Sequence, residues 1–138
     1  MKKLLFILLL WLSFWLPVFL FEEAFRSQFF TKELMSGVYR NAPLVYLSAS
    51  LVLSILTSWF SPRFFSKLWC KGLLAVVFFL FFIEMCTQVA YDYRINFGST
   101  WPYSELFPEL VAPHWYFYIF GILGMAMQYF TLQLKCKK

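Results

Sequence analysis

The sequence predicts an all-α membrane protein with four transmembrane helices. Of its 138 residues, 62% are hydrophobic and 24% are aromatic, whereas only 14% are charged. Soluble domains usually carry about 25% charged residues, and a globule this small has too little interior to hide so many apolar side chains. The apolar residues also gather in four long runs. This length suits one domain, so we expect residues 1–138 to form a single membrane domain.

The first apolar run covers residues 4–21 and contains no charged residue. It is long enough to cross the hydrocarbon core of a bilayer as a helix. It is also longer than the core of a signal peptide, and two glutamates follow it with no small-x-small cleavage site before them. We therefore expect an uncleaved signal anchor. The other spans are expected at residues 42–60, 72–91 and 114–134.

The second run carries Ser50, Ser54 and Ser58 at one-turn spacing. Small residues at this spacing let helix backbones approach closely in lipid. Each hydroxyl can alternatively bond to a carbonyl one turn earlier in its own helix. We expect this face to pack against another helix rather than to bind a ligand.

Positive charge predicts the orientation of the four spans. The bias of Lys and Arg in short loops places the more basic side in the cytoplasm. An arrangement with both termini inside gives eight basic residues inside and four outside. The inner set is Lys2, Lys3, Arg63, Lys67, Lys71, Lys135, Lys137 and Lys138, and the outer set is Arg26, Lys32, Arg40 and Arg94. These short clusters form no basic stripe, so we expect no nucleic acid partner.

The cysteines indicate neither a disulfide framework nor a zinc site. Cys70, Cys86 and Cys136 are too few and too scattered for either. With both termini inside, Cys70 and Cys136 would face a reducing compartment and stay free thiols.

The first outer segment, residues 22–41, contains a weakly amphipathic stretch. From Glu22 to Tyr39 apolar residues recur at near-helical spacing; they are Phe25, Phe29 and Phe30, then Leu34 and Val38. Acidic residues in the first turn suit a helix N-terminus. This pattern predicts an interfacial helix that begins at Glu22, with a plain connecting loop as the alternative.

Glu84 is the one acidic residue inside a predicted span. A carboxylate at this depth must face protein or water, or be protonated. The polar residues that follow it at helical spacing predict a stripe from mid-membrane to the outer surface; they are Thr87, Gln88, Tyr91 and Asp92. Three interpretations are open: a proton or ion path, a lipid-headgroup site, or a structural contact with the serines of the second span.

The second outer segment, residues 92–113, extends this candidate surface through Arg94, Glu105 and Glu109. Its prolines predict short helical pieces rather than one long helix; they are Pro102, Pro108 and Pro113. His114 could ligate a metal with the two glutamates, but one histidine and two acids at loose spacing are a weak pattern. We expect no metal and no cofactor, and we place His114 at the membrane interface.

The chain lacks the common catalytic signatures. There is no glycine-rich phosphate loop, no G-x-S-x-G, no H-E-x-x-H and no C-x-x-C. We therefore do not expect this chain to act as an enzyme on its own.

Residues 81–111, FFIEMCTQVAYDYRINFGSTWPYSELFPELV, resemble the N-terminal membrane region of lipoteichoic-acid-synthase-like proteins. These are phosphoglycerol or phosphoethanolamine transferases of the sulfatase superfamily. Ile95 departs from their pattern, where proline is usual. Tyr103, Ser104 and Phe107 are loose matches. The matching residues are Glu84, Thr87, Tyr91, Asp92, Arg94, Asn96, Glu105, Leu106, Pro108, Glu109 and Val111.

The resemblance implies a bacterial inner membrane and the membrane part of an envelope enzyme. Family members continue into a catalytic domain with a threonine nucleophile and a divalent metal, and no residue of this chain takes either role. We therefore expect a non-catalytic module that binds membrane lipids at their headgroups or docks an envelope transferase. A small transporter or channel subunit that uses Glu84 and a non-functional truncated paralogue are the alternatives.

Overall fold

The computed structural model describes residues 2–29, 41–60, 64, 67–94 and 102–136. Within these ranges every regular element is helical. The long helices are α1 (Lys2–Phe29), α2 (Ala42–Ser58), α4 (Leu68–Tyr93) and α6 (Trp115–Cys136). A short helix α5 (Tyr103–Leu106) leads directly into a π-helical turn η3 (Phe107–Val111).

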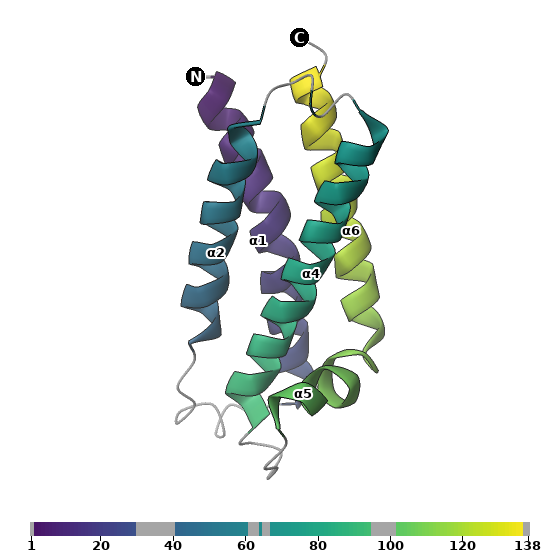
Figure 1. The fold of residues 1–138 in the computed structure, drawn as a ribbon. Helices are drawn as coiled ribbons and strands as arrows, with labels where there is room; N and C mark the ends of the chain where they lie inside the picture. The colour runs from purple at the N-terminus through teal and green to yellow at the C-terminus, as the bar shows by residue number, and fades with distance from the viewer. Residues whose placement is uncertain (1, 30–40, 61–63, 65–66, 95–101, 137–138) are drawn as a thin grey trace.

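The four long helices form an antiparallel bundle (Figure 1). Helix α1 begins and helix α6 ends at one end of the bundle, which we call the terminal end. Helix α5 lies at the opposite end, which we call the α5 end. An up-and-down order of this kind brings helices that are neighbours in sequence together in space.

Three of the helices are long and apolar enough to cross a membrane: Lys3–Gln28, Leu68–Tyr93 and Trp115–Leu134. The prediction of an all-α fold is confirmed for the described residues, and three of the four predicted spans are long and apolar enough to cross a membrane. Helix α2 is apolar but has only 17 residues. At 1.5 Å per residue it is about 26 Å long, against about 30 Å for a typical hydrocarbon core.

Helix α1 continues well past the predicted end of the first span. It runs without a break through Glu22 to Phe29, so the prediction of a separate interfacial helix beginning at Glu22 is wrong. The physical reason is that the core-facing pattern of this helix continues: Phe21 and Phe25 are fully buried, and Phe25 packs against Tyr93. The rest of the predicted interfacial helix, including Leu34 and Val38, lies outside the described residues.

The serine face of α2 packs as predicted. Ser50, Ser54 and Ser58 are all buried, and α2 lies against both α1 and α4. Their hydroxyls donate to carbonyls three residues earlier, at 2.9, 2.7 and 2.7 Å. Both expected features therefore occur together: the small side chains allow close packing, and the hydroxyls are satisfied within their own helix.

Aromatic rings fill the core between α1, α4 and α6. The Phe78 and Phe82 rings stack with centroids 5.7 Å apart, and Phe82 stacks on Phe117 at 5.1 Å. Cys70 and Cys86 are buried and form no disulfide. Of the two thiols expected to be free, this confirms Cys70, whereas the side chain of Cys136 lies outside the described residues. These ring contacts pack α4 against α6. The segment formed by α5 and η3, which we call the α5 segment, rests against the α5 end of α4.

The α5 segment consists of the short pieces that its prolines predicted. Pro102 precedes α5, and Pro108 lies in the first turn of η3, where a missing N–H costs little. The wide turn closes with a hydrogen bond from the Ala112 N–H to the Phe107 carbonyl at 2.8 Å. Buried apolar side chains anchor the segment against the bundle; they are Leu106, Leu110 and Val111.

Candidate functional site

The polar residues of α4 do not share one face, so the prediction of a single stripe is wrong. A helix turns about 100° per residue, which puts Asp92 about 80° to one side of Glu84 and Thr87 about 60° to the other. Glu84 is exposed, whereas Thr87 and Asp92, to either side of it, are buried. The predicted residues therefore divide between the outer surface and the interior.

Glu84 is held by the α5 segment. The Tyr103 hydroxyl donates to Glu84 Oε1 at 2.6 Å. Burial, this hydrogen bond and the charge of Glu84 all raise the pKa of Tyr103 above its ordinary value, so the hydroxyl stays a proton donor. The carboxylate thus lies beside the segment that joins α4 to α6. The α2 serines donate within their own helix. The partner that the structure gives Glu84 is Tyr103 rather than one of these serines.

Arg94 is the C-cap residue of α4 and stacks on an aromatic ring. Its guanidinium carbon lies 3.4 Å from the centroid of the Tyr91 ring, a close cation–π contact. The Tyr91 ring in turn lies 5.8 Å from that of Tyr103. Within the described part of the chain, Arg94 forms no ion pair with a carboxylate. We call Glu84, Tyr91, Arg94 and Tyr103 the Arg94 patch.

The other predicted site residues contribute less to this patch. The Thr87 hydroxyl donates to the Ile83 carbonyl of its own helix at 2.8 Å, and Gln88 is half-buried. Glu105 on α5 and Glu109 on η3 are both exposed. The structure therefore joins Glu84 and Arg94 through two tyrosines and leaves the two later glutamates on the surface.

His114 lies between aromatic rings rather than among acids. Its ring stacks on Tyr116 at 5.0 Å and meets the Phe25 ring edge-on at 5.8 Å. Burial lowers the pKa of His114 below its ordinary value, which favours the neutral imidazole. Over the described ranges, no three His, Cys, Asp or Glu side chains gather in a way that could hold a metal ion.

A second polar cluster lies inside the bundle at the α5 end, and of its members the sequence analysis had singled out only Asp92 as a candidate site residue. Glu22 of α1 is 3% exposed and accepts hydrogen bonds from the Tyr46 hydroxyl at 2.8 Å and the Tyr93 hydroxyl at 3.3 Å. Asp92 accepts a bond from the Ala42 N–H at 2.6 Å. These contacts join α1, α2 and α4, and we call Glu22, Tyr46, Asp92 and Tyr93 the Glu22 cluster.

The Glu22 cluster positions the Arg94 patch. Asp92 and Tyr93 point inward and are bonded to α2 and α1. Their neighbours Tyr91 and Arg94 lie on the outward side of the same final turn. The hydrogen bonds of the inward pair therefore hold the last turn of α4, which carries Tyr91 and is followed directly by Arg94.

Comparison with known proteins adds no assignment to this geometry. The chain matches no family model, and no curated protein and no solved structure matches it.

Proposed function

We propose that this chain is a four-span protein of the bacterial inner membrane, with both termini inside. In this proposal it is a non-catalytic module that binds the phosphate of a phospholipid headgroup at the Arg94 patch. The observation that carries the proposal is the Arg94 guanidinium, which is stacked on Tyr91 without a carboxylate partner among the described residues. Two features support it: the arrangement of the helices and the chemistry of the patch.

The helix arrangement supports an even number of crossings. Helix α1 begins at the end of the bundle where α6 ends (Figure 1). Helix α2 lies alongside α1 and, at 17 residues, reaches the lower limit for crossing a bilayer. The greater number of basic residues at the terminal end favours that end as the cytoplasmic one.

Cysteine labelling tests the four-span topology. In a variant whose native cysteines are replaced, we expect Ser104→Cys on α5 to react with an impermeant maleimide in intact cells. Lys67→Cys, just before α4, should react only after the membrane is opened. Both positions are exposed. A three-span arrangement with α2 on the outer surface would reverse the two results and overturn the proposed topology.

The chemistry of the patch suits a phosphate group. A guanidinium offers several N–H donors in a planar fork that matches phosphate oxygens, and it stacks on aromatic rings while doing so. Tyrosines at a membrane interface sit at the level of the headgroups. Glu84 is about 15 Å along the helix from Arg94, ten residues at 1.5 Å each. One headgroup is too small to reach both charges, so the proposal assigns the phosphate to Arg94 and leaves Glu84 as the partner of Tyr103.

We expect Arg94→Ala to weaken retention of phospholipid by about fivefold. A cation at a membrane surface contributes about 1 kcal/mol toward an anionic group, which corresponds to this factor. The measurement is native mass spectrometry of the protein in mild detergent, titrated with phosphatidylglycerol. Arg94→Lys should lose less, because it keeps the charge but not the planar fork.

Arg26→Ala is the matched control for this experiment. Arg26 lies near the same end of the bundle but is already paired with Glu23 at 2.5 Å. Its replacement removes the same charge without touching the patch. Equal losses in Arg26→Ala and Arg94→Ala would show that only net charge matters, and the proposal would be withdrawn.

The sequence resemblance suggests what such a module would serve. A transferase that consumes or delivers phospholipid-derived groups is the proposed partner, with the Arg94 patch presenting headgroups to it. A transporter that uses Glu84 gains no support, because that side chain is exposed and bonded to Tyr103 rather than facing the interior of the bundle.

A further inference from the structure

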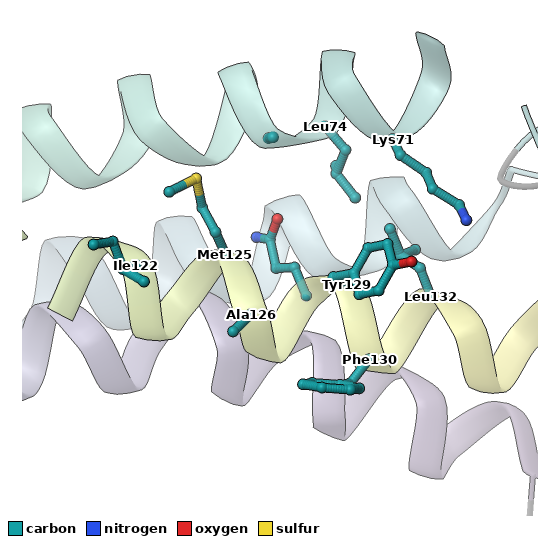
Figure 2. Close-up of a pocket in the computed structure, with 10 residues that line it drawn as sticks. Lys71, Leu74, Ile122, Met125, Ala126, Tyr129, Phe130 and Leu132 are labelled. Carbon is teal, nitrogen blue, oxygen red and sulfur yellow. The ribbon is translucent and has the colours of Figure 1, made fainter. Parts of the chain in front are cut away.

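A groove runs between α4 and α6 near the terminal end of the bundle. Arg94 follows the other end of α4. Its volume is about 450 Å³, within the range of small-molecule sites. Apolar side chains from both helices form most of its wall, among them Leu74, Ile122 and Met125. Figure 2 shows Lys71 and Tyr129 toward one end of the groove, with Met125 and Ile122 farther along it.

Besides the Tyr129 hydroxyl, two polar side chains interrupt this apolar wall. Lys71 lies at the start of α4, and its ammonium is 5.3 Å from the centroid of the Tyr129 ring. Gln128 of α6 also lines the groove and is 3% exposed. Its Nε2 atom is buried and has no hydrogen-bond partner among the described residues. A buried amide donor without an acceptor costs free energy, so an occupant that supplies an acceptor would be stabilised here.

We propose that the groove binds an anionic glycerophospholipid from the leaflet at the terminal end. The lipid's acyl chain lies along the apolar wall, an ester carbonyl accepts from Gln128 Nε2, and the phosphate lies near the Lys71 ammonium. The order of groups in the lipid matches the order in the groove. Gln128 precedes Tyr129 in α6, which ends at the terminal end, so the amide is attached one residue farther from that end than the Tyr129 ring is.

The unpartnered amide favours a lipid over a second copy of this chain. A transmembrane helix laid into the groove has its backbone carbonyls bonded within itself, and so offers Gln128 few acceptors. A diester lipid carries free carbonyl oxygens directly below its phosphate. Lys71 adds a preference for a headgroup of net negative charge, because a basic side chain at this level attracts anionic lipids.

The test compares lipids and variants by native mass spectrometry of the full chain in mild detergent. We expect diester phosphatidylglycerol to be retained about fivefold more than phosphatidylcholine of the same chains. Lys71→Gln should abolish this preference. Lys67→Gln should leave it intact, because Lys67 is exposed, lies one turn earlier and does not line the groove.

A second comparison isolates Gln128. Protein that carries Gln128 should retain diester phosphatidylglycerol more strongly than its diether analogue, which lacks ester carbonyls. Gln128→Met, of similar shape but without donors, should retain both equally. Both comparisons are made in the Arg94→Ala background, so that lipid bound at the Arg94 patch does not mask the preference of the groove.

Three results would overturn the proposal. Lys67→Gln could lower the preference as much as Lys71→Gln does. The diether analogue could bind as well as the diester where Gln128 is present. The bare protein could instead appear as a dimer that Gln128→Met disrupts, which would assign the groove to a second copy.

Discussion

Gly124→Ala should lower the stability of the bundle by about 1–3 kcal/mol, the usual cost of inserting a methyl group into a full core. A Cβ atom at this position would lie 2.2 Å from Phe78 Cζ and 2.8 Å from Pro17 Cγ. Phe78 and Pro17 are both buried, and the proline ring cannot rotate away. Helices α1 and α6 share the most extensive contact in the described bundle. Gly124 lies in α6 at the point where α6 packs against both Pro17 of α1 and Phe78 of α4.

The remaining described glycines provide a graded control. At Gly121 a new Cβ would lie 3.3 Å from the Phe82 ring, a tight but tolerable contact, and at Gly72 it would meet nothing within 4 Å. Thermal unfolding in mild detergent should therefore give a midpoint for Gly124→Ala at least about 3 °C below the wild type. The midpoint of Gly121→Ala should fall by less than that of Gly124→Ala, and the midpoint of Gly72→Ala should equal that of the wild type. Equal midpoints for all three variants would contradict the packing seen around Gly124.

Glu22→Ala should destabilise the α5 end of the bundle by about 1–3 kcal/mol. The change removes the acceptor of two buried tyrosine hydroxyls, those of Tyr46 and Tyr93, which then lose their shared partner. Glu22→Gln should cost less, because the amide oxygen still accepts a hydrogen bond. Hydrogen exchange of the backbone amides at the start of α2 and the end of α4 measures the local effect.

The adjacent residue provides the control for Glu22. Glu23 is on the same turn but is paired at the surface with Arg26. Surface ion pairs contribute roughly 0–1 kcal/mol, so Glu23→Ala should leave exchange at these two helix ends nearly unchanged. If Glu23→Ala loosened α2 and α4 as much as Glu22→Ala, the three-helix role of the Glu22 cluster would be refuted.

The helices could be predicted because apolar length and composition dominate their formation in a membrane. The residues at which helices end were predicted less well, as the C-terminal end of α1 illustrates. Its core-facing residues Leu10, Phe14 and Val18 recur every four positions, and Glu22 is the next in that series. Two adjacent acids suggested the start of a new element. In the folded chain the helical period outweighs their charge, because tyrosines from two other helices satisfy Glu22.

The candidate site was only partly predictable for a similar reason. Spacing alone placed Glu84 and Asp92 on one face, but over eight residues a helix drifts by about 80°. That drift sends Asp92 toward the start of α2. The pairing of Glu84 with Tyr103 depends on how the α5 segment folds back onto α4, a long-range contact that no local pattern encodes. The series of Leu10, Phe14, Val18 and Glu22 was the available signal for the buried cluster.

The unequal lengths of the helices have a consequence for the surrounding lipid. In the proposed four-span arrangement, α2 is about 4 Å shorter than an average hydrocarbon core, whereas α1, with 28 residues, is about 42 Å long. Leucines on the exposed side of α2, among them Leu44, Leu51 and Leu56, face outward along this short helix. A bilayer relieves such hydrophobic mismatch by thinning locally, at a fraction of a kcal/mol per ångström. The protein should therefore partition into regions of short or disordered acyl chains, with α2 as the side that determines this preference.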